Sequence, residues 1–304
     1  MIRYTKALKL ISENVIKSKT LETIKTENSQ NRILGRDYYS KINLPKNNLS
    51  AMDGAIIYRK EKNLKLKIIG ESKAGDKKAK KFKIGECNLV YTGAPVFGNN
   101  KQVIPRENFE IKENYLIINS LSNESFIRKK ASDLIKNKKY LFCNEVINIR
   151  SIALAKSMRI NYLKVIKRPK VLVICTGDEL INEKKKQSLV VSTNNIFIKH
   201  FVELFGGEIV NIHFSKDNQT EFKKIFKSSK NFDLLITSGG ISRGKYDIVK
   251  ESLKEFGLKI LFDRVAIKPG KPTTFGKLGK NKFFLGLPGN PVSCFMSLTN
   301  FLPI

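Results

Sequence analysis

Short apolar stretches alternate with amphipathic ones in the second half of the chain. The apolar runs are unbroken, which is typical of strands buried on both faces of a sheet. They predict strands at 171–175, 209–214, 233–237, 259–267 and 283–287. Helical spacing of the residues between them predicts helices at about 194–205, 219–229, 247–256 and 292–301. Because strands and helices alternate, this half should form a mostly parallel, helix-covered α/β sheet.

The first half has a different pattern. Leu8, Ile11 and Val15 are at helical spacing and predict an amphipathic helix over 4–16. Between 64 and 121, short apolar pieces are separated by glycine and asparagine turns, which is typical of a small β domain. With 304 residues, the chain should contain two or three domains.

A helix over 145–158 and a short strand over 163–166 precede a linker at Arg168 and Pro169. We therefore expect four parts. They are an N-terminal helical and linking segment at 1–42, a small β domain at 43–136, a return of the linking segment at 137–166, and the α/β domain at 167–304.

Three of the predicted strands end in turns that contain glycine. These turns lie at 176–180, 239–240 and 288–291. Parallel strands present their carboxyl ends at one edge, and ligands of open α/β sheets bind there. A glycine turn that leads into a helix also exposes backbone N–H groups to an anion. The sequence therefore predicts an anion site at this edge, and Lys268 and Lys271 could join it from a proline-stiffened loop.

The chain is strongly basic, with 57 Lys+Arg against 27 Asp+Glu and a net charge of +30. Such a value can indicate a nucleic-acid partner. Here the lysines are scattered and do not alternate with aromatic residues, so we expect a solvated surface and no nucleic-acid or membrane partner. The four cysteines form no CxxC pair, and no apolar stretch of about 18 residues is present. We expect a cytoplasmic protein.

Six motifs together resemble those of one family. They are SAMDG at 50–54, TGAP at 92–95, TGDEL at 176–180, SGGIS at 238–242 with Asp247, KPGKP at 268–272 and LPGNP at 287–291. In this order they resemble MoeA, the molybdopterin molybdenumtransferase family that includes the gephyrin E domain. The resemblance covers nearly the whole chain. It implies an elongated linking domain, a small β domain and a MogA-like α/β domain, without the family's C-terminal β domain.

The resemblance also implies an activity. The expected enzyme takes adenylylated molybdopterin and molybdate, releases AMP with the help of a divalent cation, taken to be Mg²⁺, and leaves molybdenum on the pterin. It implies a homodimer, and contacts with a MogA-like adenylyltransferase and molybdoenzyme chaperones. Two alternatives stay open, a molybdopterin adenylyltransferase and a catalytically lapsed pterin-binding or scaffold protein.

The resemblance and the chemistry of the turns together nominate site residues. The expected catalytic residues are Asp53, Thr92, Asp133, Glu179, Asp217 and Asp247. The expected substrate-binding residues are Arg128, Gly239, Gly240, Ser242, Arg264, Lys268, Lys271, Pro288, Gly289, Asn290 and Pro291. Three carboxylates follow predicted strand ends and suit Mg²⁺, which prefers oxygen ligands; they are Glu179, Asp217 and Asp247. Arg264 or Arg128 could hold molybdate.

Several of these residues have a purely structural alternative. Asp53 could close a turn, and Thr92 could be a turn residue. Glu179 and Asp247 could cap the elements that follow them. Asp217 lies in an ordinary loop composition, and both prolines of the last turn shape it without chemistry. The chain also departs from the family's pattern at Lys101, where the family usually has a carboxylate.

Overall fold

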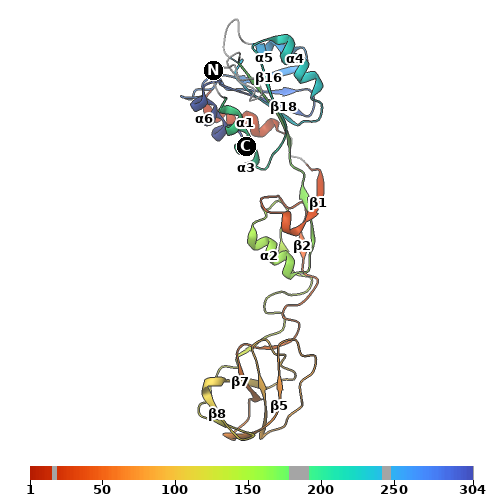
Figure 1. The fold of residues 1–304 in the computed structure, drawn as a ribbon, viewed down its shortest axis with the longest axis vertical. Helices are drawn as coiled ribbons and strands as arrows, with labels where there is room; N and C mark the ends of the chain where they lie inside the picture. The colour runs from red at the N-terminus through yellow and green to blue at the C-terminus, as the bar shows by residue number, and fades with distance from the viewer. Residues whose placement is uncertain (16–18, 178–191, 242–247, 304) are drawn as a thin grey trace, which may run out of the picture. The chain divides into compact units, whose positions relative to one another are not determined.

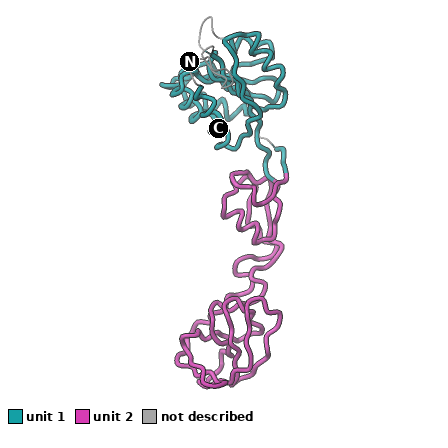
Figure 2. The backbone as a smooth tube through the Cα atoms, viewed as in Figure 1, with its two compact units in different colours: residues 1–22, 165–304 teal, residues 23–164 magenta. Residues whose placement is uncertain are grey.

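The computed structural model describes residues 1–15, 19–177, 192–241 and 248–303 of the chain. These residues form two compact units. One comprises residues 1–22 and 165–304, and the other comprises residues 23–164 (Figure 2). The first unit is therefore built from both ends of the chain, and the second from the segment between them.

The first unit contains a six-stranded sheet, in the order β14-β13-β15-β18-β17-β16. Its strands are β13 (Lys170–Thr176), β14 (Glu208–Ser215), β15 (Leu234–Ser238), β16 (Leu258–Asp263), β17 (Thr274–Leu278) and β18 (Lys282–Leu287). The strands β14, β13, β15 and β18 are parallel, and β17 runs antiparallel to both of its neighbours. The predicted α/β class is confirmed, but the sheet is mixed because β17 returns as a hairpin that the sequence pattern did not indicate.

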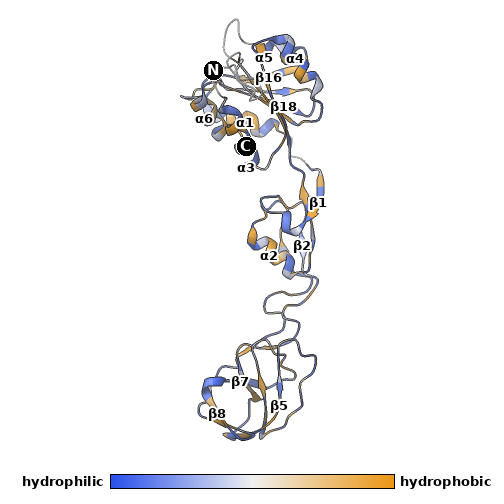
Figure 3. Cartoon of the chain, in the orientation of Figure 1, coloured by the Kyte–Doolittle hydropathy of each residue, from blue (hydrophilic) through white to orange (hydrophobic). Residues whose placement is uncertain are grey.

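Helices cover both faces of this sheet (Figure 1). They are α1 (Tyr4–Asn14), α3 (Asn194–Leu204), α4 (Gln219–Ser228), α5 (Ile248–Lys254) and α6 (Pro291–Phe301). Successive residues of β13 point to opposite faces. Val173 belongs to the core shared with α1, α3 and α6, whereas Leu172 belongs to the core shared with α4 and α5. The unbroken apolar run of β13 is therefore buried on both faces, as its sequence predicted. The helices combine hydrophobic and hydrophilic stretches (Figure 3).

The N-terminal helix belongs to the α/β unit. Ala7 and Ile11 are buried in the core that also contains α3 and α6, and Ile2 forms a parallel bridge with Val265. The predicted helix is present. It packs in the α/β unit, whereas the sequence predicted that it belongs to a linking segment over 1–42. Helical spacing marks an apolar face without indicating which partner covers it, and here the partner lies about 260 residues away in the sequence.

The second unit contains the predicted small β domain, a six-stranded sheet in the order β7-β4-β6-β5-β9-β8. Its strands are β4 (Gly54–Tyr58), β5 (Lys65–Ser72), β6 (Glu86–Val90), β7 (Lys101–Pro105), β8 (Phe109–Lys112) and β9 (Tyr115–Ile118). A buried apolar cluster on this sheet includes Ala55, Leu66, Ile104 and Leu116.

Short ladders connect the rest of the chain. β2 (Tyr38–Tyr39) pairs with β11 (Lys139–Leu141), β3 (Leu49–Ser50) with β10 (Ile127–Arg128), and β1 (Leu21–Lys25) with β12 (Tyr162–Ile166). Two 3-10 turns, η1 (Thr26–Asn28) and η2 (Arg106–Asn108), complete these connections. The helix α2 (Ile149–Ser157) begins four residues later than predicted, because the Asn148 side chain accepts a hydrogen bond from the Ser151 N–H and caps it.

Among the helices that the structure describes, none combines the length and the apolar character needed to cross a bilayer.

Candidate functional site

Two glycine turns and the end of β13 meet at the carboxyl edge of the α/β sheet, and residues 178–180 of the third predicted turn lie outside the described residues. The Asn194 side chain, at the start of α3, connects the two glycine turns. Its amide nitrogen donates to the Ser238 Oγ at 2.7 Å and to the Gly289 carbonyl oxygen at 2.7 Å. The Gly239 N–H donates to the Leu287 carbonyl oxygen at 3.1 Å. The turns after β15 and β18 are therefore held together as one structure.

The turn after β15 needs glycine because the end of β13 lies against it. A Cβ on Gly239 would lie 2.4 Å from the Thr176 carbonyl oxygen, and one on Gly240 would lie 2.7 Å from the Thr176 Oγ1. Both glycines also have positive φ angles, 88° and 63°, which side chains disfavour. The two glycines are needed because a side chain at either position would collide with Thr176, and not because the turn must be flexible.

Two buried oxygen atoms at this edge have no hydrogen-bond partner among the described residues. They are the Thr176 Oγ1 and the Asn194 Oδ1, on side chains that are 5% and 7% exposed. Buried polar atoms are normally paired. An unpaired hydroxyl and an unpaired amide oxygen at a sheet edge mark a place where a ligand or water could complete the pairing.

The lysine loop lies beside α6. The Thr273 Oγ1 donates to the Gly270 carbonyl oxygen at 2.7 Å and lies 2.7 Å from the Ser297 Oγ of α6. Lys268 and Lys271 are exposed on this loop. The turn at 288–291 starts the same helix, whose first turn is capped by the Asn290 side chain with Pro291 at its first position. Asn290 and Pro291 thus have a structural role as well as a place at the edge.

Arg264 lies at the same edge, because β16 runs parallel to β18 and ends at Asp263. It has a positive φ of 74°, and its N–H donates to the Thr273 carbonyl oxygen at 3.1 Å. Asp263 accepts hydrogen bonds from the Thr274 hydroxyl and the buried Lys250 ammonium. This arrangement joins Arg264 to the base of the lysine loop.

Of the three expected carboxylate ligands, only Asp217 is among the described residues. Asp217 follows β14 and is half-buried, whereas Glu179, Asp247 and also Ser242 lie outside the described residues. Within the described ranges, no group of three or more His, Cys, Asp or Glu side chains could hold a metal ion. The metal assignment therefore stays a prediction.

Two thiols lie near the turns. Burial raises the pKa of Cys175 and of Cys294 to about 12, so both favour the protonated form near neutral pH. The oxygen donors described at the glycine turns are hydroxyl, amide and backbone carbonyl groups, and oxygen donors are the kind that Mg²⁺ prefers.

A second cluster of predicted residues lies in the other unit. Asp53, just before β4, accepts hydrogen bonds from the Thr92 N–H at 2.7 Å and from the Thr92 hydroxyl at 2.8 Å. The backbone bond from Thr92, then its hydroxyl, lowers the pKa of Asp53, while partial desolvation acts in the opposite direction. The motifs SAMDG and TGAP therefore form one unit, an exposed carboxylate of lowered pKa beside a hydroxyl.

Backbone pairing holds these two motifs against a third segment. Ser50 donates to Ala94 and accepts from Gly93, at 2.8 and 2.9 Å. Ser50 also pairs with Ile127 on β10, which places Arg128 opposite Leu49. The Arg128 guanidinium forms an ion pair with Asp133. Backbone pairing thus joins the segments that carry Asp53, Thr92, Arg128 and Asp133, of which two are motifs and the third is the segment around β10.

Comparisons with known proteins identify the family of the chain. The model of the MoeA N-terminal region (domain I and II) matches residues 2–158, and that of a probable molybdopterin binding domain matches residues 172–304. The chain belongs to the MoeA family. Its role is therefore in molybdenum cofactor biosynthesis.

Relatives from this family resemble the chain over most of its length. The molybdopterin molybdenumtransferase of Haemophilus influenzae is 34% identical over 91% of this chain and 70% of its own length. That of Nostoc sp. is 30% identical over 89% of this chain and 65% of its own length. The chain thus spans about two thirds of these MoeA relatives.

A solved structure shows the same fold. The MoeA protein of Pyrococcus horikosii has a TM-score of 0.81 at 27% identity and covers 99% of this chain and 78% of its own. The resemblance proposed from the six motifs is confirmed, together with the α/β class.

Sequence reasoning missed two residues of the site. Asn194 connects two turns, and Thr176 carries an unpaired hydroxyl beside Gly240. Thr176 stands inside a motif that the sequence analysis named, so its position was available. Asn194 starts an ordinary amphipathic helix in an asparagine-rich chain, and no local pattern distinguishes it.

Proposed function

We propose that this chain transfers molybdenum from molybdate to adenylylated molybdopterin and releases AMP. The observation that supports the proposal is that Asn194 holds the glycine turns after β15 and β18 together at one edge of the sheet. The names of the curated relatives specify molybdenum transfer to molybdopterin. AMP release and the adenylylated substrate extend the proposal beyond those names.

The roles of the described residues follow from their chemistry. The glycine turns would hold the phosphate-bearing part of the substrate. Glycine has no Cβ, so a phosphate group can come close to the backbone N–H groups of these turns. Lys268 and Lys271 would neutralise its charge, and Arg264 or Arg128 would bind molybdate. Asp53, held ionised by Thr92, would serve as a base or as a ligand to an incoming cation.

Mg²⁺ is part of the proposal. Asp217 would hold it with Glu179 and Asp247, through oxygen ligands of the kind this ion prefers. When bound, the ion would neutralise charge on the phosphate oxygens as the bond to AMP breaks. A homodimer, a cytoplasmic location and contacts with an adenylyltransferase or with molybdoenzyme chaperones belong to the same proposal.

The test is an AMP-release assay with purified chain, molybdate, Mg²⁺ and adenylylated molybdopterin. Asp53→Ala should lower kcat by about 10²-fold or more, whereas Asp76→Ala should leave it unchanged. Asp76 is a matched control because it is an exposed aspartate of the same unit whose carboxylate accepts only a local bond from the Lys73 N–H.

Two outcomes would overturn the proposal. Substrate that binds without releasing AMP would reject the transfer activity. Consumption of ATP with molybdopterin would instead identify an adenylyltransferase. Equal rates in Asp53→Ala and wild type would reject the role of Asp53 and leave the reaction itself standing.

A further inference from the structure

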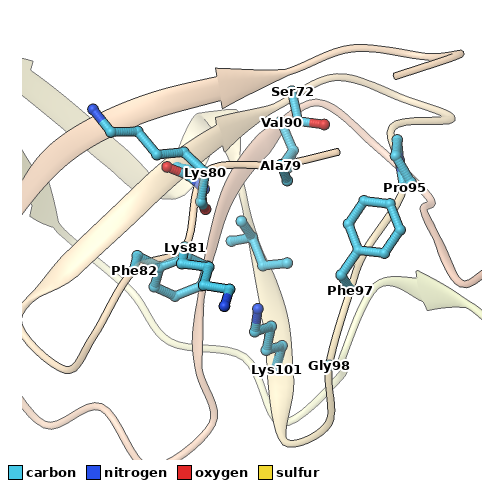
Figure 4. A pocket seen from close by; sticks show the side chains of 12 residues that line it. Ser72, Ala79, Lys80, Lys81, Phe82, Val90, Pro95, Phe97, Gly98 and Lys101 are labelled. Carbon is cyan, nitrogen blue, oxygen red and sulfur yellow. The ribbon is translucent and has the colours of Figure 1, made fainter. Parts of the chain in front are cut away.

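A cavity of about 240 Å³ lies in the small β domain, apart from the residues assigned above. Its walls are mainly apolar and include Ile56, Phe82, Val90, Pro95 and Phe97. In Figure 4, the rings of Phe82 and Phe97 lie on opposite sides of the cavity, and Lys101 lies between them. All of these residues belong to one unit, so the cavity is a feature of a single domain.

The charge inside the cavity is unbalanced. Lys81 and Lys101 line it, the Lys80 ammonium points away from it in Figure 4, and no acidic side chain is among the described residues that line it. The Lys101 Nζ lies 4.4 Å from the centre of the Phe82 ring and 5.5 Å from that of Tyr58. Aromatic faces stabilise a cation only in part. Burial lowers the pKa of Lys101, which shows that this ammonium lacks full hydration.

Two buried polar atoms in the cavity wall also lack partners among the described residues. They are the Ser72 Oγ and the Asn88 Oδ1, on side chains that are each 1% exposed. The Asn88 amide nitrogen is satisfied, because it donates to the Lys80 carbonyl oxygen at 2.6 Å. Neither atom has accessible surface, so the polar group that a guest meets in this cavity is the Lys101 ammonium.

These features select one class of ligand. The partly dehydrated Lys101 ammonium suits a carboxylate, because charge-assisted hydrogen bonds strengthen in a dry site. The two facing phenylalanine rings suit an aromatic body. Molybdate does not suit this site, because a doubly charged tetrahedral ion needs hydrogen-bond donors on several sides and the walls here are mostly apolar.

We propose that the cavity formed around Lys101, Phe82 and Phe97 is a binding site for a small aromatic carboxylate. The carboxylate accepts a hydrogen bond from the Lys101 ammonium, and the ring packs against the phenylalanine side chains of the wall. Pro95 and Phe97 continue directly from the TGAP segment that carries Thr92. A guest here therefore contacts the same chain segment that holds Asp53.

The test uses benzoate and 2-naphthoate as probes, with wild-type protein and calorimetry or amide chemical shifts as the readout. Lys101→Met keeps the aliphatic stem and removes the charge. Lys65→Met is the matched control, because the Lys65 Nζ lies 4.6 Å from the centre of the Tyr115 ring on the same domain but does not line the cavity. None of these measurements depends on turnover.

We expect wild type and Lys65→Met to bind 2-naphthoate equally, and Lys101→Met to bind it about tenfold or more weakly. The neutral amide of the same ring should also bind at least about tenfold more weakly. Chemical-shift changes should centre on Ser72, Phe82 and Phe97. Because Lys101→Met removes a partly buried charge, its thermal unfolding should match or exceed that of wild type, which separates lost binding from lost folding.

Three results would overturn the proposal. One is the absence of binding up to about 10 mM of either probe. Another is equal affinity of wild type and Lys101→Met. The third is equal affinity for the carboxylate and its neutral amide, which would indicate a purely apolar cavity. Binding of molybdate with the same shift pattern would point to an inorganic oxyanion site instead.

Discussion

One oxygen of the Asp53 carboxylate accepts two hydrogen bonds from a single residue, Thr92, through its N–H at 2.7 Å and its hydroxyl at 2.8 Å. This relationship joins two motifs that lie about 40 residues apart in the sequence. It also makes the ionisation of Asp53 a measurable property of the small β domain.

Thr92→Val should raise the pKa of Asp53 towards its ordinary value while leaving it lowered, because the backbone bond, the larger cause, remains. Carbon-detected NMR titration of the Asp53 carboxyl group measures this shift. Thr20→Val, in the other unit, is the matched control. An unchanged Asp53 titration in Thr92→Val would show that the hydroxyl bond contributes nothing.

The same pair has a pH dependence of defined sign. The pKa of Asp53 is lower in the folded chain than its unfolded value of about 3.9, so the unfolded state binds protons more readily. Its contribution to stability is complete above the unfolded pKa and disappears as the pH falls through the folded pKa. Acid unfolding of the small β domain should therefore begin at a higher pH in Thr92→Val than in wild type.

Gly54→Ala should disrupt the small β domain. A Cβ at this position would lie 2.0 Å from the Ile104 carbonyl oxygen on the adjacent strand β7. We expect a loss of about 3 kcal/mol in the free energy of unfolding, measured by urea denaturation. Gly85→Ala is the comparison, because nothing lies within 4 Å of its Cβ and only its positive φ of 85° opposes the change. It should cost about 1 kcal/mol, and equal losses in both variants would contradict the packing argument.

Asn194→Ala should loosen the edge of the α/β sheet. It removes two hydrogen bonds and leaves the Gly289 carbonyl and the Ser238 hydroxyl without this donor. A loss of about 2–3 kcal/mol in stability should appear as faster hydrogen exchange at β15 and β18, together with reduced AMP release. Asn148→Ala, which removes only the cap of α2, should cost about 1 kcal/mol without affecting AMP release.

The four cysteines should differ sharply in reactivity. Cys87, Cys175 and Cys294 are buried, and burial raises the pKa of each to about 12. Because thiolate is the reactive form, iodoacetamide at pH 8 should modify Cys143 alone in the folded chain. Mass spectrometry after mild treatment, and again in urea, counts the modified sites. Early modification of a buried cysteine would contradict the described cores.

The parts of the fold that sequence reasoning predicted well are those with a strong local signal. The runs that became β13, β15 and β18 are apolar throughout, and each ends at a glycine turn. The strand β17 was missed because Thr274, Gly276 and Lys277 interrupt its apolar pattern, and its burial depends on the two flanking strands. Strand β7 was missed for a similar reason, since Pro105 closes it and its pairing with β4 comes from a distant segment.

The site shows the same division between local and distant signals. The motifs suggested Asp53 and Thr92 as separate site residues. Only the structure shows that the Thr92 N–H and hydroxyl donate hydrogen bonds to the Asp53 carboxylate. The clustering of Arg128 and Asp133 around Ser50 likewise depends on the pairing of β3 with β10, which no local pattern indicates. Long-range backbone pairing is what sequence periodicity cannot supply.

The discontinuity of the first unit has a consequence for synthesis on the ribosome. Helix α1 emerges first, but Ala7 and Ile11 bury themselves among residues of α3 and α6 that are translated much later. The intervening unit is translated without interruption and contains its own apolar clusters, so it has what it needs to fold while the α/β sheet is still incomplete. The apolar face of α1 therefore stays uncovered during translation until α3 and α6 have been made.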